Sequence, residues 1–486
     1  MELNVEGQKP AQKMSITSTE RRWLLHILDL IAINGGFLLS IAYRADYQLS
    51  WGLIVQRPEW FVLLNGLWFI LGNLLQVYDI ERAGRPRSAY LPVLYTGLAT
   101  TTVFNFIPYL TPTLPESRQP LFIAILLPVC LLMVGRLIYL MVFARARFRR
   151  KVLILGAGWA GKTIFEVLTE HGETLYDVVG FVDDDPQKLG EIIKERPEDP
   201  ESGSLQPASA KVLGSSAELI QLTEEYGVST IVLAITRNVH GPLYQVLTDC
   251  LQREIEVIPM PLLYEEMTGK VPVEHIGDHW SVSMPLEQPG TRLAWHAVKR
   301  LFDLFWASLG LVVLAILFPF IAAAIRLDSP GPILYTQKRM GRNGKVFQVY
   351  KFRSMRVDAE KNQAVWAQKN DPRVTRVGKF LRKTHIDEFP QFWNILKGEM
   401  SVVGPRPERP EFVSELAKEI PFYRVRLAVK PGMAGWGLIH QGYGASKKDA
   451  LEKLQFDLYY IKHQSFWLDL FVLWRTVLDA ITLGGR

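Results

Sequence analysis

The stretch His385-Ile386-Asp387-Glu388-Phe389-Pro390-Gln391, followed by Ser401-Val402-Val403-Gly404-Pro405-Arg406-Pro407, places two adjacent carboxylates ahead of a rigid loop that carries an arginine. Proline is tolerated only in the first turn of a helix, so Asp387 and Glu388 are expected at or just before the positive end of one. A negatively charged helix cap is the simplest interpretation of such a pair. The surrounding residues decide whether the pair also carries chemistry.

The composition limits the class of protein. The chain has 486 residues, which allows roughly three domains. Its net charge of +6 is modest for this length and argues against a dedicated nucleic-acid-binding protein. Cys130 and Cys250 are the only cysteines, so by themselves they form neither a disulfide framework nor a four-ligand zinc site. We expect a polar tail over residues 1–20 and no cleavable signal peptide ahead of the first apolar run.

Four apolar runs of membrane-spanning length fill the first third of the chain, at about residues 23–43, 60–77, 90–109 and 120–143. Arginines and lysines gather before the first run, between the second and third, and after the fourth, whereas the other two loops hold few. The positive-inside rule therefore predicts a four-helix transmembrane bundle over residues 21–147 with both ends in the cytoplasm. Arg136, inside the fourth run, is expected to extend to the inner membrane surface.

A buried-strand pattern at residues 151–155 leads into a glycine fingerprint made of Gly156, Gly158 and Gly161. A helix-like segment follows, and Asp183 comes at about the distance of a ribose-binding acid. These features predict a Rossmann-like α/β domain over residues 148–290. Nucleotide binding by the three glycines and Asp183 is a separate hypothesis, because a structural or regulatory use is the simpler one. The Tyr-x-x-x-Lys pair of short-chain dehydrogenases is absent between residues 151 and 290.

Residues 301–325 form a further apolar run, preceded by Lys299-Arg300 and followed by Arg326. It is long enough to cross a membrane, and a plain spanning helix is the simplest interpretation. A fifth crossing would however place the rest of the chain outside the cell, away from nucleotides. Pro319 allows a bent helix, so we predict a re-entrant helix that enters and leaves by the cytoplasmic leaflet.

The C-terminal run at residues 466–483 gathers Asp469, Arg475 and Asp479 in one sector of a helix, opposite apolar residues. This pattern predicts an amphipathic helix that lies on the bilayer or packs on the domain core.

Between the two apolar runs the chain is basic, and Gln337, Arg339, Lys351 and Arg353 belong to its cation-rich segments. Cations beside a carboxylate pair suit a phosphate-rich substrate, although each one alone is more simply a solvated surface charge.

With these motifs in place, residues 295–486 resemble the bacterial sugar transferase domain of the monotopic phosphoglycosyl transferases. The matching motifs are Lys299-Arg300-x-x-Asp303, Asp328-Ser329-Pro330-Gly331-Pro332, Lys351-Phe352-Arg353-Ser354-Met355, Asn370-Asp371-Pro372-Arg373, Arg382-x4-Asp387-Glu388-Phe389-Pro390-Gln391, Asn394-x-x-Lys397-Gly398-Glu399-Met400-Ser401, Gly404-Pro405-Arg406-Pro407 and Lys430-Pro431-Gly432-Met433-x-Gly435. The four apolar runs and the Rossmann-like segment match the large, polyprenyl glycosylphosphotransferase form of that family. One position departs from it: the family's helix break usually carries Ser-Pro where this chain reads Ala315-Ile316.

The resemblance implies that a UDP-sugar and a polyprenyl phosphate give a polyprenyl-diphosphate-sugar and UMP. This is the first membrane step of exopolysaccharide, capsule or O-antigen assembly. In the family the aspartate of the pair attacks the β-phosphate and forms a covalent phosphosugar intermediate, with Mg²⁺ bound nearby. Carried over, Asp387 is the nucleophile and Glu388 its partner, and both belong to the metal site. The positions expected to contact phosphate or substrate are Lys351, Arg353, Arg382, Arg406, Gln337, Arg339 and Asp457.

The implied fold is a membrane protein of mixed α and α/β class, with a catalytic domain over residues 295–486 that carries the re-entrant helix and amphipathic interfacial helices. The implied partners are UDP-hexose, undecaprenyl phosphate, the lipid bilayer and a second copy of the chain in a homodimer. The implied location is the bacterial cytoplasmic (inner) membrane, with the catalytic domain facing the cytoplasm. Nothing in the sequence separates galactose from glucose as the transferred sugar.

Two other classes of function stay open. A membrane-anchored nucleotide-sensing or scaffold protein with an inactive transferase domain would bind a nucleotide at the glycine fingerprint and release no UMP. A membrane-tethered nucleotide-sugar oxidoreductase is weakened by the missing Tyr-x-x-x-Lys pair.

Overall fold

The computed structural model describes residues 18–44, 46–47, 50–84, 86–143, 149–172, 175–194, 209–235, 241–275, 292–357, 372–441 and 446–481. The chain divides into two compact units, Met1–Leu263 and Tyr264–Arg486. The polar tail predicted over residues 1–20 lies outside the described residues up to residue 17, and its last three residues already belong to the first helix. Asn370 and Asp371, from one of the family motifs, also lie outside them.

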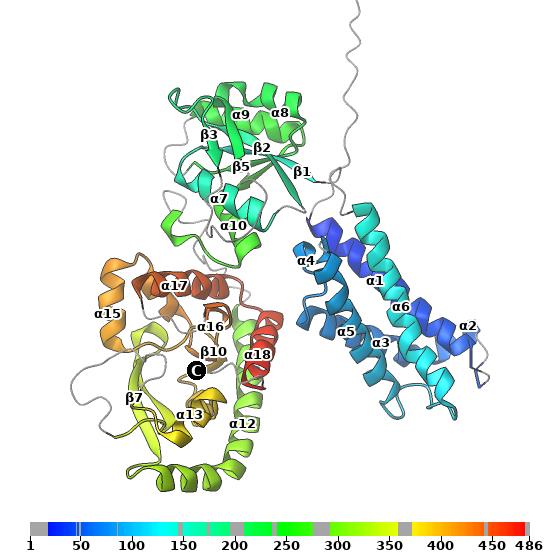
Figure 1. The fold of residues 1–486 in the computed structure, drawn as a ribbon, viewed down its shortest axis with the longest axis vertical. Helices are drawn as coiled ribbons and strands as arrows, with labels where there is room; N and C mark the ends of the chain where they lie inside the picture. Colours follow the sequence, from blue (N-terminus) through cyan, green and yellow to red (C-terminus); the bar gives the residue numbers. More distant parts are fainter. Residues whose placement is uncertain are drawn as a thin grey trace, which may run out of the picture. The chain divides into compact units, whose positions relative to one another are not determined.

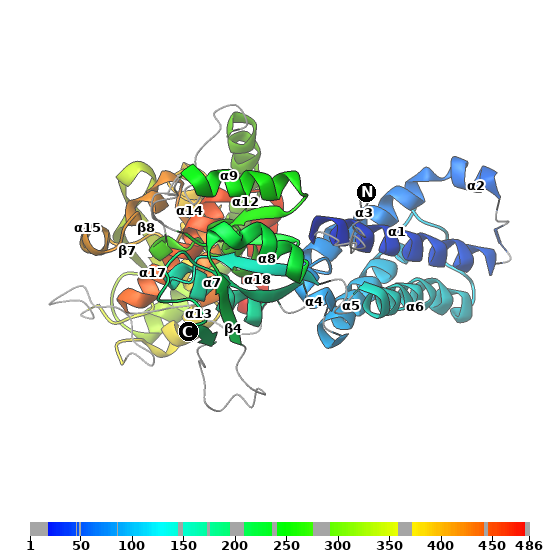
Figure 2. The ribbon, with the colours of Figure 1, turned by 90° about the horizontal axis from the view of Figure 1, so that it is seen from above.

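Four long helices form the first part of the first unit: α1 (Ser18–Ala42), α3 (Pro58–Leu74), α5 (Pro86–Asn105) and α6 (Arg118–Phe143). The short helices α2 (Trp51–Gln56) and α4 (Ile80–Gly84) lie between them in the chain. α6 packs along both α1 and α5, and Figure 1 and Figure 2 show the four long helices side by side from two directions. Apolar side chains such as Leu64 are buried between them, and the Phe37 ring meets Phe104 edge-on.

Three helical segments are long and apolar enough to cross a membrane, judged by length and composition over the part of the chain that is described. They are Thr19–Ala42, Arg118–Val142 and Trp295–Asp328. This indicates a membrane protein. α3 and α5 stand where two more spans were predicted, but α3 has only 17 residues, and α5 buries the polar Thr96 and Thr100. Membrane crossing by α3 and α5 therefore stays a prediction.

Arg136 does not extend to a membrane surface as predicted. Its side chain is 1% exposed, and its Nη2 atom donates to Asp29 Oδ2 on α1 at 2.8 Å. Charged side chains inside apolar helix bundles face the bundle interior and pair with one another, because an unpaired charge there is costly. The prediction was wrong because it considered α6 alone, whereas the neutralising acid lies on a different helix.

The second part of the first unit is a six-stranded sheet with the order β3-β4-β2-β1-β5-β6. Its strands are β1 (Arg150–Leu155), β2 (Tyr176–Val182), β3 (Ile192–Lys194), β4 (Ser209–Gly214), β5 (Thr230–Leu233) and β6 (Glu256–Pro259). All neighbouring pairs are parallel except β3 and β4. The last four residues of β1 are fully buried, as expected of a parallel strand covered on both faces. The helices of this part are α7 (Trp159–Glu170), η2 (Ser216–Glu218), α8 (Leu219–Tyr226) and α9 (Gly241–Gln252).

The second unit begins within α10 (Met260–Thr268) and holds the predicted catalytic domain. Its elements are η3 (Val273–His275), α12 (Arg292–Asp328), β7 (Leu334–Met340), η4 (Arg342–Gly344), β8 (Val346–Phe352), α13 (Arg376–Lys383), η5 (Ile386–Glu388), α14 (Gln391–Lys397), β9 (Ser401–Val403), α15 (Pro410–Glu419), η6 (Tyr423–Ala428), β10 (Gly432–Ala434), α16 (Trp436–Gln441), α17 (Lys447–Lys462) and α18 (Phe466–Ile481). β7 and β8 form an antiparallel hairpin, and β9 and β10 pair in parallel. Val271 and Val273 pack into the core of this unit, ahead of the predicted boundary at residue 295.

α12 is one helix of 37 residues that contains Pro319. Figure 1 shows its second half turned away from its first half before the chain enters β7. Proline removes a backbone hydrogen bond and clashes with the carbonyl four residues earlier, which bends a helix. Leu314 before the proline and Ile321 after it pack against the same apolar cluster, which includes Phe352 and Leu381. The bend is present without the Ser-Pro pair, and entry and exit by one membrane leaflet stays a prediction.

α18 turns its acidic side toward the domain core. Asp469 is 1% exposed, accepts a hydrogen bond from the Tyr460 hydroxyl at 2.8 Å and pairs with Lys299. Val472, one turn away, is fully buried. The core-packed form of the predicted amphipathic helix is therefore observed on this side, while Trp467 and Val477 are exposed on other positions of the helix.

Candidate active site

Asp387 and Glu388 lie in η5, a short turn between α13 and α14. His385 opens the turn with a left-handed backbone, φ 57°, which reverses the chain after α13. Pro390 stands at the N-cap of α14, so the two acids precede the positive end of that helix as the sequence predicted. Their side chains are nonetheless largely buried, with 8% and 6% exposure. A solvated helix cap does not account for that burial.

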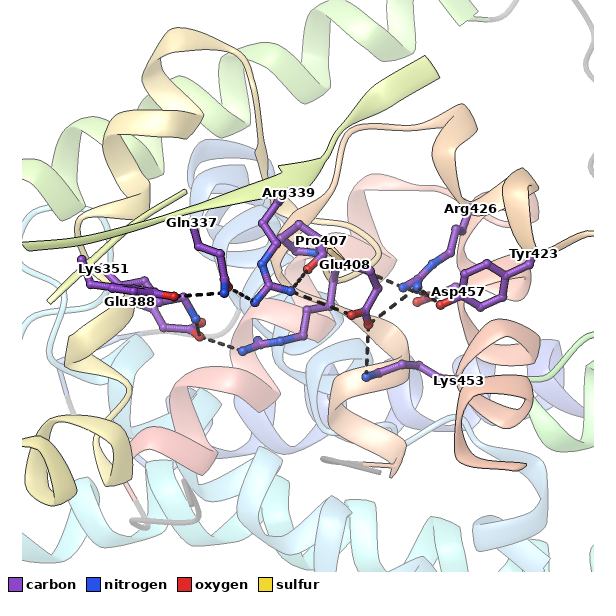
Figure 3. Close-up of polar contacts among 12 residues, drawn as sticks. Gln337, Arg339, Lys351, Glu388, Pro407, Glu408, Tyr423, Arg426, Lys453 and Asp457 are labelled. Carbon is purple, nitrogen blue, oxygen red and sulfur yellow. Dashed lines mark hydrogen bonds and ion pairs between the residues drawn. The ribbon is translucent and has the colours of Figure 1, made fainter. Parts of the chain in front are cut away.

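Glu388 is held by two cations that come from different elements. Its Oε1 atom lies 2.6 Å from Lys351 Nζ, on β8, and 2.8 Å from Arg406 Nη2, in the loop after β9 (Figure 3). Burial opposes ionisation, but Arg406 and Lys351 hold the pKa of Glu388 well below its usual range. Glu388 is therefore an ionised, charge-neutralised acid.

Asp387 is in the opposite state. Among the described residues, none donates a hydrogen bond to its carboxylate or forms an ion pair with it. Burial and the neighbouring Glu388 raise the pKa of Asp387 to about 7, against the lowering effect of Lys351, Arg382 and Arg406. Within the described structure the Asp387 carboxylate therefore breaks no hydrogen bond or ion pair when it reacts. Its raised pKa makes it a stronger nucleophile than an ordinary aspartate once it is ionised.

The loop that carries Arg406 is fixed by a close backbone approach. Gly404 N donates to Ala434 O at 2.9 Å, next to the β9–β10 pair. A Cβ atom on Gly404 would lie 2.5 Å from the backbone oxygen of Lys430, and one on Gly432 would lie 2.1 Å from Gly404 N. Only glycine fits at both positions, which explains why the Gly-Pro-Arg-Pro and Lys-Pro-Gly-Met motifs occur together.

The other predicted cations near the pair divide into two kinds. Arg382, on α13, is half-buried and acts on Asp387 through its charge. Arg339, on β7, instead turns toward the protein itself: its Nη2 atom donates to Gln337 Oε1 at 2.6 Å and its Nη1 atom to Pro407 O at 3.0 Å. Gln337 and Arg339 thus support the Arg406 loop, and direct substrate contact by them stays a prediction.

Asp457, on α17, is buried and paired with Arg426, whose Nη2 atom lies 2.8 Å from Asp457 Oδ2. Arg426 also donates to the Tyr423 hydroxyl at 2.7 Å and lies near Glu408. Asp457 was predicted as a substrate-contacting acid, and the structure gives it an arginine of the protein as its partner. Arg426, Glu408 and Lys453 were not predicted from the sequence. Arg426 shares its segment with Arg424, which is exposed, so the sequence offered no signal that separates the buried cation from the exposed one.

Arg353 was predicted to bind phosphate; the structure gives its guanidinium backbone partners, and phosphate binding by this residue stays a prediction. Its guanidinium is 5% exposed and donates to the backbone oxygens of Pro330 at 2.6 Å and Ser329 at 2.7 Å. It also donates to Ile325 O, near the C-terminal end of α12, at 3.3 Å. Arg353 therefore fastens the end of α12 and the loop after it: both of its Nη atoms donate to backbone carbonyls, while its buried Nε atom has no partner among the described residues.

The glycine fingerprint adopts the expected strand–loop–helix arrangement between β1 and α7. Gly156 has a φ of 112°, and a Cβ on Gly161 would lie 1.9 Å from Gly156 O, whereas Gly158 faces open space. The Asp183 carboxylate, however, accepts hydrogen bonds from Ala157 N at 2.7 Å and Lys188 Nζ at 3.1 Å. A ribose would have to displace these contacts, and nucleotide binding here stays a prediction.

The second unit also matches known proteins in sequence. The family model for the bacterial sugar transferase matches residues 294–482, which include every residue of the site around Asp387 and Glu388. A UDP-N-acetylgalactosamine-undecaprenyl-phosphate N-acetylgalactosaminephosphotransferase from Aeromonas hydrophila is 39% identical over 247 residues, covering 51% of this chain and 57% of that protein. The matched region thus spans little more than half of that relative.

Two further relatives match a shorter part of the chain. A UDP-glucose:undecaprenyl-phosphate glucose-1-phosphate transferase from Escherichia coli is 43% identical over 184 residues, covering 37% of this chain and 39% of that protein. An exopolysaccharide production protein from Rhizobium leguminosarum is 42% identical over 193 residues, which are 38% of this chain and 96% of that protein. The latter match extends over almost the whole relative. On this evidence the chain belongs to the bacterial sugar transferase family.

Proposed function

We propose that the protein transfers a hexose-1-phosphate from a UDP-hexose to undecaprenyl phosphate, and so starts the assembly of an exopolysaccharide, capsule or O-antigen. The observation that carries the proposal is the asymmetry of the acidic pair. Asp387 is buried and has no hydrogen-bond or ion-pair partner among the described residues, whereas its neighbour Glu388 is held by Lys351 and Arg406. The names of two relatives describe the transfer of a sugar phosphate to undecaprenyl phosphate, which supports the same substrate class for this protein.

In the first step an Asp387 carboxylate oxygen attacks the β-phosphorus of the UDP-hexose. A bond from Asp387 to that phosphorus forms, and the bond from the β-phosphorus to the bridging oxygen breaks. UMP leaves with the electron pair, and the hexose-1-phosphate remains on Asp387 as an acyl phosphate. The covalent intermediate divides one difficult step, the direct attack of the lipid phosphate on the UDP-hexose, into two easier displacements at the same phosphorus.

In the second step an oxygen of undecaprenyl phosphate attacks the same phosphorus. The new bond is the phosphoanhydride of the lipid diphosphate-sugar, and the Asp387 carboxylate leaves with its electron pair. Neither step requires a net proton transfer, so the protein's task is to neutralise charge and to hold the reacting groups in line. Lys351 and Arg406 supply positive charge at the site.

The residues present are compatible with Mg²⁺. Among the described residues, there is no group of three or more His, Cys, Asp or Glu side chains arranged for a metal. Mg²⁺ is often bound by only one or two carboxylates and completed by substrate phosphates and water, which fits Asp387 and Glu388. When bound, Mg²⁺ would neutralise the charge of the diphosphate. Glu388 would then share its carboxylate between the metal and the two cations that already hold it.

The acceptor's phosphate lies at the surface of a bilayer, and the proposed site has to meet it there. The bent α12 exposes large apolar side chains, among them Phe305 and Ile316. We propose that this helix dips into the cytoplasmic leaflet of the bacterial inner membrane, so that the catalytic domain faces the cytoplasm and its nucleotide sugars. Association into a homodimer is part of the same proposal and is tested by the size of the purified protein in detergent.

The full chain, purified in detergent, tests the proposal. Incubation with Mg²⁺, undecaprenyl phosphate and a UDP-hexose should release UMP, and a panel of UDP-glucose, UDP-galactose and UDP-N-acetylgalactosamine identifies the sugar. Asp387→Asn should release none, while Glu411→Gln, at an exposed acid of the same unit, should match the wild type. Wild-type protein that released no UMP with any sugar of the panel would contradict the proposal.

A further inference from the structure

The loop of residues 405–408, which carries Arg406, is bound at each of its four carbonyl oxygens. Gly432 N donates to Pro405 O at 2.8 Å, and Met340 N donates to Glu408 O at 2.9 Å. The two inner oxygens are bound by arginine side chains: Arg426 Nη2 donates to Arg406 O at 3.1 Å and Arg339 Nη1 to Pro407 O at 3.0 Å. The backbone on which Arg406 stands is therefore fixed from both sides.

A single carboxylate links the two arginines. Glu408 Oε2 lies 3.9 Å from Arg339 Nη1, and Glu408 Oε1 lies 3.7 Å from Arg426 Nη1. Lys453 Nζ lies 3.8 Å from the same Oε1 atom. Figure 3 shows Glu408 between these cations, with Asp457 behind Arg426. Glu408 is thus the common counter-ion of the groups that hold its own loop.

The arrangement points away from direct phosphate binding by these arginines. Arg426 is 4% exposed, and its donors are taken by Arg406 O, the Tyr423 hydroxyl and Asp457. Arg406, by contrast, aims its guanidinium at Glu388 beside the proposed nucleophile. A cation that stabilises a transition state is effective only if its position is fixed before the reaction, because reorganisation then costs nothing during the step.

We propose that Glu408, Arg339 and Arg426 are positioning residues, which hold the 405–408 loop and act on the reaction only through Arg406. This inference rests on the proposed function, since it assigns a task to Arg406 in that reaction. It reassigns Arg339 from substrate contact to support of the loop, and it gives Asp457 the task of keeping Arg426 in place.

A double-mutant cycle on UMP release distinguishes this role from a direct one. Glu408→Gln should lower kcat/KM at least about tenfold, mainly through kcat, because a mispositioned Arg406 stabilises the transition state less well. In an Arg406→Ala background the same substitution should lower kcat/KM by less than about twofold, because residues that act through one partner are not additive. Additive losses would mean that Glu408 acts independently of Arg406 and would overturn the proposal.

Controls separate positioning from folding. Glu452→Gln, on α17 next to Lys453, breaks the ion pair with Lys270 outside this network and should leave kcat/KM within about twofold of the wild type. Thermal unfolding is measured for each variant. If Glu408→Gln does not fold, Arg339→Gln, which removes the donor to Pro407 O, takes its place in the cycle.

The same cycle on the single-turnover rate of UMP release, measured with enzyme in excess of UDP-hexose, covers variants whose steady-state turnover is too low to measure. Coupling between Glu408→Gln and Arg406→Ala in this rate supports the proposal, and additivity contradicts it. The failure of this inference is distinct from a failure of the proposed function. If the wild type releases UMP but the cycle is additive, only the positioning role is wrong. If the wild type releases no UMP, the proposed function itself is wrong.

Discussion

Asp387 and Glu388 are adjacent in the chain and both buried, yet within the described part of the chain only Glu388 is ion-paired, with Lys351 at 2.6 Å and Arg406 at 2.8 Å from one of its oxygens. A buried acid without a partner is costly to ionise, whereas a neighbouring acid between two cations is ionised easily. The environments of the two carboxylates therefore indicate different roles: Asp387 reacts, and Glu388 binds and orients Lys351 and Arg406.

Activity should depend on the ionisation of Asp387. Burial and Glu388 raise the pKa of Asp387 to about 7, and only its ionised form can attack. kcat/KM for UMP release should therefore rise with pH up to about 7 and level off above it. In Glu388→Gln the negative neighbour is removed, so this rise should move to lower pH while the maximal rate falls. A rise that keeps its position in Glu388→Gln would show that another group controls it.

Asp387→Asn should stabilise the protein at alkaline pH while it abolishes turnover. The pKa of Asp387 is raised in the folded state, so its contribution to stability is fully present at low pH and is lost as pH rises through about 7. Asparagine avoids this loss of unfolding free energy. The loss is about 1.4 kcal/mol for each pH unit by which the pKa differs between the folded and the unfolded protein. The melting temperature of the variant should exceed that of the wild type at pH 8, and the difference should shrink at pH 5. An equal difference at both pH values would contradict the assignment.

Lys351 and Arg353 are two residues apart, and their substitution should have opposite consequences. Lys351→Met removes one of the two cations from Glu388, leaves Arg406 to neutralise it, and should lower kcat/KM by about 100-fold or more. Arg353→Met leaves backbone carbonyls at the end of α12 without their donor, each hydrogen bond to a charged group being worth about 1.5–3 kcal/mol. It should lower the melting temperature, while the folded fraction keeps its KM for UDP-hexose. A raised KM with unchanged stability would restore Arg353 as a substrate contact.

The ion pair between Asp29 and Arg136 predicts a non-additive effect on stability. Asp29→Asn leaves the Arg136 charge buried and should destabilise the helices by about 3–5 kcal/mol. The double variant Asp29→Leu/Arg136→Leu removes both charges and should recover much of that loss, because apolar side chains of similar size often replace a buried pair without cost. Thermal unfolding in detergent measures both. A double variant less stable than Asp29→Asn would indicate that the pair does more than neutralise itself.

Local patterns in the sequence predicted the elements of the fold well. The glycines at 156 and 161, the apolar runs and Pro319 each constrain the backbone through their own chemistry, and helices, strands and a bend are found there. The acidic pair ahead of α14 was likewise predicted from Pro390. Contacts between distant segments were not predictable in this way. Arg136 meets Asp29 across 107 positions of sequence, and Asp457 meets Arg426 across 31.

Arg353 illustrates why the candidate site was only partly predictable. It shares the motif Lys351-Phe352-Arg353-Ser354-Met355 with Lys351, and both were assigned to phosphate because they are cations close to the acidic pair. β8 ends at Phe352, however, so Arg353 lies just beyond the strand that holds Lys351. The direction of the Arg353 side chain is decided by the carbonyls at the end of α12, a feature of tertiary structure that the motif does not contain.

The protein is proposed to react through a covalent step on Asp387, and mass spectrometry of the intact protein and of its peptides tests this most directly. Wild-type protein incubated with Mg²⁺ and its UDP-hexose, without acceptor lipid, should gain the mass of one hexose phosphate. After digestion, the added mass should lie on the peptide that contains Asp387. Addition of undecaprenyl phosphate should remove that mass, and Asp387→Asn should never show it. UMP release by the wild type without any adduct, together with turnover by Asp387→Asn, would contradict the account.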